Sequence, residues 1–374
     1  MSITERIEKF RQSYVNTKPQ ISCERAKIYT DSYRETEGEP MCIRSAKAYL
    51  AACEKLPVTI FDDEIIVGTA GEFKRTGILT PEFSWKWVDK EMDKFSTRGQ
   101  DPYEMTDEQR EFTRKEIFPY WKGKSLEELY LKRLPEDTAK ILIDTGVLDN
   151  DSKWRQAVGE VTPDYEDILL PKGYQKIKEE ALAKIEELDI AIPENIEKIE
   201  FYKSQVIICD GIMTFAKRYS DLAYEMAQKE INEKRKAELI KIGDVCKKVP
   251  AYPPESFHEA IQFIWFVQVG GIICENPLSL NPGRFDQYIY PYYEKDIKEG
   301  KIDKDGALEL IEALWIKYSE WVWTISENTA GYFAGYNQFQ NLTVGGRKRD
   351  GSDATNDLTY LCLQATKDVK THQP

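Results

Sequence analysis

The residue types that carry most enzyme chemistry are unevenly represented in this sequence of 374 residues. There are only two histidines, His258 and His372, so neither a Ser-His-Asp triad nor a multi-histidine metal site is easily assembled. The seven cysteines are scattered without a C-x-x-C pair, which argues against a disulfide framework and against a zinc or iron–sulfur site. Ordinary acid–base chemistry would therefore have to come from carboxylates.

Two long helices are predicted in the middle of the chain, where apolar residues recur at spacings of three or four. The first covers residues 199–223, and Cys209 in its apolar stripe is expected to be a core residue rather than a nucleophile. The second follows Pro254, and His258 near its start is expected to be structural. This helix should give way to the apolar, glycine-containing stretch 267–274.

The remaining elements alternate between strands and helices. A buried strand is predicted at residues 64–68, and a second at 341–344, where a double glycine closes it. Asp303 is a plausible cap for a helix that reaches Tyr318. A last helix should be capped near Ser352 or Asp353 and should bury one apolar face, made of Leu358, Leu361, Cys362 and Ala365.

The charge balance limits the partners that the protein can have. With a net charge of -13 and a pI near 5.0, the surface repels phosphate backbones and anionic lipids, so nucleic acid and membrane partners are not expected. The basic cluster Arg347-Lys348-Arg349 is expected to be a solvated turn. The amino terminus has no apolar run of signal-peptide length, and no run of eighteen apolar residues occurs, which predicts a cytoplasmic protein.

Several segments in a fixed order resemble the glycyl radical enzymes of the pyruvate formate-lyase superfamily, from about Arg25 to Pro374. The resemblance is strongest to the branch of choline trimethylamine-lyase, the glycerol and propanediol dehydratases and hydroxyproline dehydratase. The matching segments are Asp63-Glu64-Ile65-Ile66-Val67-Gly68, Ile117-Phe118-Pro119-Tyr120-Trp121, Val249-Pro250-Ala251, Glu259-Ala260-Ile261-Gln262, Pro282-Gly283-Arg284-Phe285-Asp286-Gln287-Tyr288, Tyr290-Pro291-Tyr292-Tyr293, residues 341–346 and Asp353-Ala354-Thr355-Asn356.

This resemblance implies an α/β fold, the amino-terminal half of a ten-stranded glycyl-radical-enzyme barrel surrounded by helices. Residues 1–374 would be an incomplete pyruvate formate-lyase domain. It would lack the half that carries the cysteine loop and the carboxy-terminal glycine radical domain. The chain ends a few residues beyond its last predicted helix, which fits that expectation.

The resemblance also implies how the whole enzyme works. A glycyl radical near the carboxyl terminus, installed by a radical SAM iron–sulfur activating enzyme, is relayed through a mid-chain cysteine to a small-molecule substrate, with a glutamate as base. Neither the Gly-Cys-Val-Glu loop nor the Arg-Val-Ala-Gly-Tyr segment of that family occurs here. No catalytic residue and no metal ligand is therefore assigned to this chain, which alone is expected to be inactive. The full-length enzyme is expected to be a homodimer.

The same resemblance implies which residues of this chain would line part of a substrate pocket. Glu160 matches a position where choline lyase has an aspartate and the diol dehydratases have a histidine, each facing the substrate. The alternative interpretation is a glutamate on the surface. Phe339 matches a pocket aromatic, although plain barrel core would look the same. Ser279 matches a serine that touches substrate in glycerol dehydratase, or it is an ordinary turn serine. Ser152 stands where choline lyase has a tyrosine, which counts against choline, and Glu160 counts against a simple diol.

The function that this resemblance implies is elimination of water or an amine from a small hydroxylated substrate. A thiyl radical would take a hydrogen from the carbinol carbon, and the neighbouring group would then leave while a carboxylate moves the proton. A dry, enclosed pocket would protect the radical. Two alternatives stay open: a formate acetyltransferase of the pyruvate formate-lyase type, and a non-catalytic half-barrel that binds or scaffolds a partner.

Overall fold

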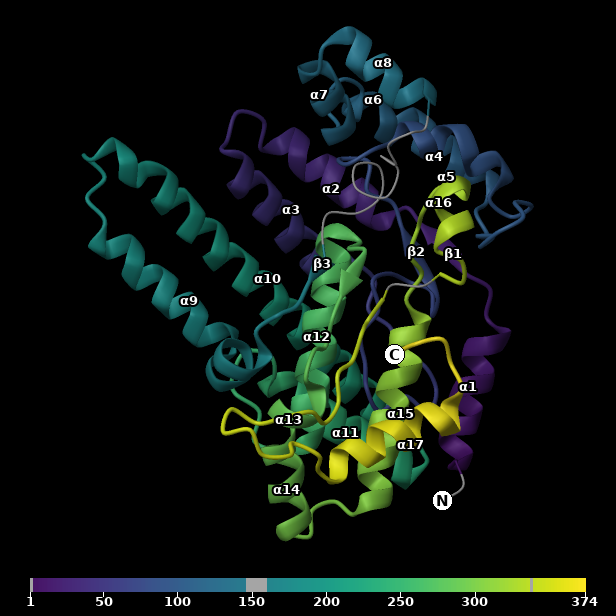
Figure 1. Ribbon diagram of the computed structural model, residues 1–374, viewed down its shortest axis with the longest axis vertical. Helices are drawn as coiled ribbons and strands as arrows, with labels where there is room; N and C mark the ends of the chain where they lie inside the picture. Colours follow the sequence, from purple (N-terminus) through teal and green to yellow (C-terminus); the bar gives the residue numbers. More distant parts are fainter. Residues whose placement is uncertain (1–2, 146–159, 337–338) are drawn as a thin grey trace.

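A computed structural model describes residues 3–145, 160–336 and 339–374. Helices make up most of this structure and surround short parallel strands (Figure 1). The amino-terminal elements are α1 (Glu5–Asn16), β1 (Gln20–Ser22), α2 (Glu24–Glu35), α3 (Met41–Lys55), β2 (Thr76–Ile78), α4 (Lys86–Glu91), η1 (Met92–Lys94), α5 (Asp107–Phe112), η2 (Thr113–Ile117), α6 (Phe118–Trp121), α7 (Leu126–Arg133) and α8 (Glu136–Thr145). Those that follow are β3 (Glu160–Val161), η4 (Tyr165–Leu169), α9 (Leu170–Glu187), α10 (Pro193–Lys229), α11 (Glu233–Lys248), α12 (Phe257–Glu275), β4 (Ser279–Leu280), α13 (Phe285–Tyr288), α14 (Tyr290–Lys298), α15 (Lys304–Glu320), α16 (Glu327–Tyr332) and α17 (Asp357–Val369).

The strands form two parallel groups. β1 pairs with β2, and single bridges extend this group from Gln20 to Glu104 and from Gly77 to Val322. β3 pairs with β4, and a further bridge joins Gly283 to Leu342. All of these pairings are parallel, so each needs a long crossover connection, and helices supply those connections. The result is an α/β arrangement in which helices cover short parallel strands.

Helix α12 forms the centre of the core. It is apolar and long enough to cross a membrane by length and composition, but 83% of its apolar window is buried inside the protein, as in the core helix of a globular fold. The sequence predicts that this helix gives way at residues 267–274, which is wrong. The helix continues to Glu275, and its glycines allow close packing: a Cβ at Gly271 would lie 2.7 Å from Leu280 Cδ2.

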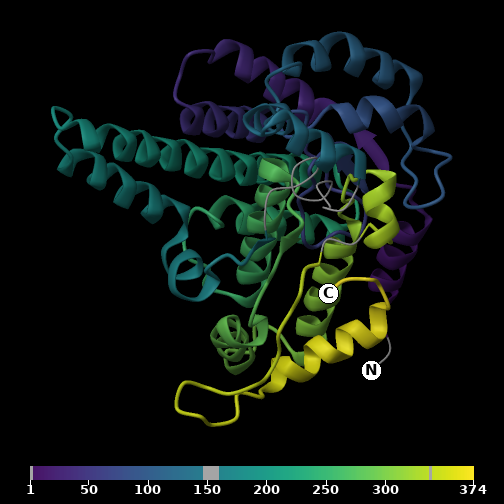
Figure 2. The same cartoon turned by 45° about the horizontal axis from the view of Figure 1, so that its top comes forward.

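Helices α9 and α10 lie side by side and project from one side of the molecule (Figures 1 and 2). The predicted helix over residues 199–223 is confirmed as part of α10. Cys209 is buried within it, as expected of a core residue, and burial raises the pKa of its thiol to about 12. His258 is also structural as predicted, since its Nε2 lies 2.9 Å from the carbonyl oxygen of Ile65.

Two helices near the carboxyl end pack against each other and against α1. Asp303 caps α15 as predicted, because its side chain accepts a hydrogen bond from Gly306 N. The apolar face predicted for α17 is buried, which confirms that part of the prediction. The cap of the helix is Asn356, and the prediction of Ser352 or Asp353 is wrong. Asn356 and Thr359 form a reciprocal capping box, which fixes the helix start three or four residues later than expected.

The buried segment 64–68 is not a strand, contrary to the prediction. Its backbone groups are instead satisfied by side chains of α12. Gln262 receives a hydrogen bond from Val67 N at 2.9 Å and donates one to Val67 O at 2.8 Å. Trp265 Nε1 donates to Gly68 O at 3.0 Å. The prediction of burial is therefore confirmed, but the hydrogen-bond partners are side chains and not a neighbouring strand.

The segment 341–344 is also not a regular strand. Only Leu342 makes a bridge, with Gly283, and Thr343 N donates to Gly283 O at 2.8 Å. The two glycines that follow have positive φ angles of 65° and 83°, and they turn the chain away before a ladder can form. The basic cluster lies beyond them as an exposed turn, which was predicted, and Arg347 bridges to Asp353 across it.

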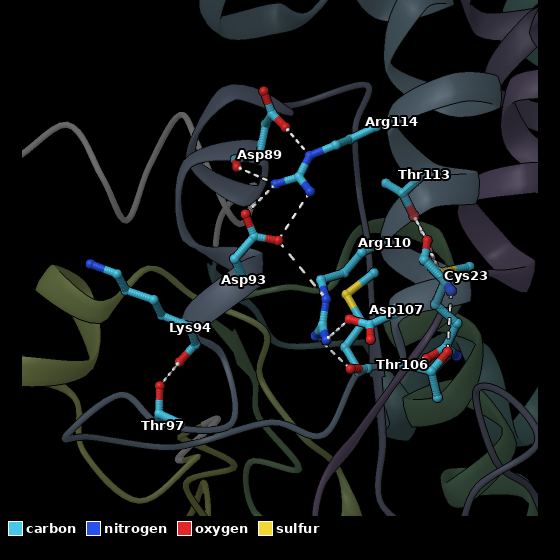
Figure 3. A network of polar contacts seen from close by, with 12 residues as sticks. Cys23, Asp89, Asp93, Lys94, Thr97, Thr106, Asp107, Arg110, Thr113 and Arg114 are labelled. Carbon is cyan, nitrogen blue, oxygen red and sulfur yellow. Dashed lines mark hydrogen bonds and ion pairs between the residues drawn. The ribbon is translucent and has the colours of Figure 1, made fainter.

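An ion-pair network on the surface joins α4 and η1 to α5 and η2 (Figure 3). Arg114 contacts Asp89 at 2.9 Å and Asp93 at 2.7 Å, while Arg110 contacts Asp107 at 2.5 Å. These carboxylates are largely exposed, so each pair contributes less than about 1 kcal/mol. The network therefore orients these short helices more than it stabilises the fold.

Candidate functional site

The three residues that the sequence suggests for substrate binding come together around β3 and β4. Glu160 and Ser279 are register partners in this parallel pair, although they are far apart in the chain. Asn281 N continues the pairing by donating to Val161 O at 2.8 Å. Residues 146–159, which include Ser152, lie outside the described part of the chain, and the side chain of Glu160 is not described.

Ser279 connects this strand pair to the third residue of the site. Its Oγ lies 2.9 Å from the carbonyl oxygen of Phe339 and 2.9 Å from Asn281 Oδ1. The hydroxyl has one hydrogen, so it donates to one of these oxygens at a time, while its own lone pairs can still accept. The same amide oxygen of Asn281 accepts from Asn341 N at 3.0 Å. Ser279 and Asn281 thus hold the 339–341 segment beside β4.

Phe339 takes an unusual backbone conformation in order to reach this position. Its φ is 52°, in the left-handed region that aromatic residues rarely adopt, so the position is strained. The ring meets Phe333 edge-on with 5.4 Å between centroids, and Phe333 in turn meets Trp323 at 6.0 Å. These aromatics form a small cluster that is separate from the main core. Phe339 is half-buried, so its ring borders the cluster rather than closing it.

The other strand group carries Trp323 to this cluster. Val322 bridges to β2, and Tyr103 holds the residues that follow it: its OH donates to Trp323 O at 2.7 Å and accepts from Ile325 N at 3.1 Å. Arg98 Nη1 also donates to Ile325 O at 2.8 Å. The aromatic cluster therefore lies between the two parallel strand groups, with Trp323 from one group and Phe339 beside the other.

Asp286 fixes the loop that follows the 339–342 segment, and sequence reasoning did not give it this role. The buried carboxylate accepts from Gly345 N at 2.7 Å and also bonds to the hydroxyl of Thr359. Arg284 donates to the carbonyl oxygen of Gly345 at 3.0 Å. The signal was present, because both residues belong to the segment Pro282–Tyr288 that carries the family resemblance. Trp323 and Phe333 were also missed, since no periodicity marks them.

No cysteine of the chain fits the role of a radical relay. All seven lie in helices or, for Cys23, at a helix cap, whereas the resemblance implies a cysteine on a loop. Cys23 is buried against Thr113 Oγ1 at 3.4 Å (Figure 3), and burial raises the pKa of its thiol to about 11. In the described ranges no group of three histidine, cysteine or carboxylate residues could hold a metal ion.

Comparison with known proteins identifies relatives of this chain. The family model described as "Pyruvate formate lyase-like" matches residues 2–374. The chain belongs to that family. It is 39% identical over 380 residues to an isethionate sulfite-lyase of Nitratidesulfovibrio vulgaris, covering 99% of this chain and 46% of the relative. The chain therefore spans about half the length of the curated relatives that it matches.

Solved structures of the family agree with the fold. A glycerol-bound B12-independent glycerol dehydratase from Clostridium butyricum superposes with a TM-score of 0.94 at 36% identity, covering 100% of this chain and 47% of that one. A glycyl radical enzyme from Archaeoglobus fulgidus gives a TM-score of 0.93 at 36% identity, covering 99% and 47%. The predicted fold is confirmed: the two strand groups are part of the barrel of glycyl radical enzymes.

Proposed function

We propose that this chain forms one wall of the substrate pocket of a glycyl radical lyase or dehydratase that acts on a small hydroxylated substrate. One observation carries the proposal: Glu160, Ser279 and Phe339, each matched to a substrate-facing position, meet at one place around β3 and β4. A glutamate, a serine and a phenylalanine at neighbouring backbone positions bring together three residue types with an acidic, a hydroxyl and an aromatic side chain. Such a mixture is typical of a small-molecule site.

The chemical roles of these residues follow from their side chains. The carboxylate of Glu160 would accept a hydrogen bond from a substrate hydroxyl or pair with an amine, and Ser279 would add a second polar contact. Phe339 would supply an apolar surface against the carbon skeleton. Together these groups would hold and orient the substrate and keep water out, which makes an intramolecular elimination efficient.

The radical must come from residues that this chain does not contain. We propose an organic glycyl radical, installed by a radical SAM iron–sulfur activating enzyme and supplied by the remaining half of the barrel. That group would give the hydrogen abstraction that unactivated carbon requires. Homodimer formation and a cytoplasmic location are proposed on the same family resemblance. Without the second half, we expect the chain to be inactive.

The leaving group is the open part of the proposal. The relatives named above include a lyase whose name specifies isethionate and sulfite and a dehydratase bound to glycerol. Water, an amine and sulfite are therefore all reasonable leaving groups for this protein. The acyltransferase alternative has less support, because these relatives are lyases and dehydratases.

Sequencing the source DNA past the codon for Pro374 is the first test. The proposal expects a reading frame, continuous or on a second gene, that encodes a Gly-Cys-x-Glu loop and an Arg-Val-Ala-Gly-Tyr segment. If no such frame exists, the enzyme hypothesis fails and a binding or scaffolding half-barrel replaces it.

The assembled protein should then be activated anaerobically and offered glycerol, 1,2-propanediol, isethionate and trans-4-hydroxy-L-proline. Turnover of one compound, with a glycyl radical visible by electron paramagnetic resonance, would support the proposal. The variant Ser279→Ala should raise KM for that compound, whereas the exposed control Ser352→Ala should not.

A further inference from the structure

A small cavity lies where α12, the end of α15 and the loop before β2 meet. Its volume is about 20 Å³. Most of the wall is apolar, from Ala70, Phe73, Trp265, Val269 and Ile272. Polar side chains also line it, those of Lys74, Glu320, Trp321, Thr69 and Thr76.

Glu320 and Trp321 lack part of their hydrogen bonding. Trp321 Nε1 and Glu320 Oε1 are buried and have no hydrogen-bond partner among the residues that the structure describes. Trp321 is 4% exposed and Glu320 is 3% exposed, so bulk water cannot serve them. Lys74 Nζ lies 3.7 Å from Glu320 Oε1, which is too long for a hydrogen bond. A gap of this length between two polar groups often holds a bridging water.

The charges around the cavity decide what kind of molecule fits. Lys317 Nζ lies 2.6 Å from Glu64 Oε1 and 2.6 Å from Glu320 Oε2. With Lys74 added, two ammonium groups and two carboxylates balance. A metal cation would meet two neighbouring ammonium groups, and an anion would meet two carboxylates. The ligand should therefore be neutral.

We propose that this cavity binds one water molecule as a fixed part of the structure. Its volume is enough for a single water, and a buried water usually makes about three hydrogen bonds. Here the water would accept from Trp321 Nε1 and from Lys74 Nζ and donate to Glu320 Oε1. Trp321 Nε1 and Glu320 Oε1 then gain the partner that the protein does not provide, and Lys74, which already donates to Ser13 Oγ at 2.8 Å, gains a second one.

The water has a positioning role. It joins Lys74, on the loop that leads into β2, to Glu320 at the end of α15 and to Trp321. Two residues further along, Trp323 enters the aromatic cluster with Phe333. The water thus helps to fix the segment 321–325 at the wall of the candidate site. This proposal does not depend on the reaction that the protein catalyses.

An experimental structure of the protein at better than 2 Å resolution tests the proposal directly. We expect one density peak within about 3.2 Å of Trp321 Nε1, Lys74 Nζ and Glu320 Oε1. An empty cavity, or one filled by a rotated side chain, would overturn it.

A solution measurement gives an independent answer. In the protein labelled with ¹⁵N-tryptophan, the Trp321 indole N–H should show a cross-peak to a long-lived water, assigned by its loss in Trp321→Phe. The control is Trp315, whose indole N–H donates to Thr366 Oγ1 at 3.0 Å and should show no water cross-peak. The proposal is wrong if the Trp321 indole behaves like that of Trp315.

Discussion

The hydroxyl of Ser279 lies 2.9 Å from the carbonyl oxygen of Phe339, a residue 60 positions further along the chain. This contact links a strand residue to a residue with strained left-handed backbone, since the φ of Phe339 is 52°. A strained conformation persists only where its surroundings impose it. Ser279 therefore holds the 339–341 segment beside β4, and the proposed function would give it a second role, a contact with the substrate.

Replacing Ser279 by alanine should separate these roles. The Phe339 carbonyl and the Asn281 amide oxygen would lose the one donor that they share, so the free energy of unfolding should fall by about 0.5–1.5 kcal/mol. Denaturant unfolding measures this change. Ser352, an exposed serine bonded to Asp350 within a turn, is the matched control, and its alanine variant should lie within about 0.5 kcal/mol of wild type. Equal effects at both serines would argue against a holding role.

Helices with local capping residues could be predicted from the sequence, because their determinants lie within a few positions of each other. Asp303 and the apolar residues after it specify α15 without reference to the rest of the chain. The segment 64–68 could not be predicted correctly, since its hydrogen-bond partners Gln262 and Trp265 are about 195 residues away. Local β-propensity indicated burial there but not which groups would pair with the backbone.

The candidate site was also only partly predictable from the sequence. Glu160, Ser279 and Phe339 were proposed one by one, from a resemblance, and no local pattern indicated that two strands would bring them together. The aromatic neighbours of Phe339 were missed because side-chain packing between distant segments leaves no periodic trace. Asp286 was visible as part of a matching segment, but its role in holding Gly345 required the structure.

Glu160→Gln should reveal the charge of the substrate. If the carboxylate accepts a hydrogen bond from a substrate hydroxyl, the amide should weaken binding about 10-fold to 100-fold, because hydrogen bonds to charged groups contribute about 1.5–3 kcal/mol. Calorimetric titration of the assembled protein with each candidate substrate measures this effect. Glu166→Gln, at an exposed position six residues later, should leave affinity unchanged. An anionic sulfonate substrate would instead bind more tightly to the Glu160 variant, which would contradict the hydroxyl contact.

Lys317→Met should be among the most destabilising substitutions in the chain. Lys317 is fully buried and pairs with Glu64 and Glu320, each at 2.6 Å. Burial alone would lower the pKa of Lys317, but these two carboxylates hold that pKa above its ordinary value. Removing the ammonium leaves two buried carboxylates poorly compensated, so the free energy of unfolding should fall by about 3–5 kcal/mol.

The control for Lys317 is Lys217, which pairs with Asp221 on the surface with 71% of its side chain exposed. Lys217→Met should change the free energy of unfolding by less than about 1 kcal/mol. Denaturant titration of both variants at one ionic strength makes the comparison. A loss below 1 kcal/mol in the Lys317 variant would show that the buried carboxylates simply take up protons.

His258 should make the protein less stable in mild acid. Burial, and to a smaller extent Lys241, lowers the pKa of His258 from 6.5 to about 4. Between these values the unfolded chain binds a proton that the folded protein excludes. Stability from this residue is therefore present above pH 6.5 and is lost as pH falls toward 4, by at most about 3 kcal/mol.

Thermal unfolding of wild type and His258→Gln from pH 4 to 7.5 measures this contribution. Glutamine keeps a donor for the Ile65 carbonyl but cannot titrate, so its stability should depend less on pH in that range. Since His372 titrates in both proteins, only the difference between the two curves reports His258. Parallel curves would show that the buried imidazole accepts its proton without loss of stability.

Glu312 should make the protein less stable as pH rises, whereas His258 does so as pH falls. Its side chain is 1% exposed, and burial, followed by the nearby carboxylates Asp368 and Glu309, raises its pKa to about 8. The folded protein therefore keeps this carboxyl protonated up to about pH 8, whereas the unfolded chain releases the proton near pH 4.5. The stability that belongs to the protonated form is fully present below pH 4.5 and is lost as pH rises through 8.

Glu312→Gln keeps the shape of the neutral carboxyl and removes its titration, so the variant should be more stable than wild type at pH 8. Since the pKa rises from 4.5 to about 8, the gain is at most about 5 kcal/mol, and it should shrink toward zero below pH 5. Exposed Glu111, paired with Lys115 on the surface, provides the control, because Glu111→Gln should show no such gain. Denaturant unfolding at pH 5 and pH 8 measures both variants. If Glu312→Gln destabilises equally at the two pH values, the carboxylate is ionised in the folded protein and its partner must be a cation.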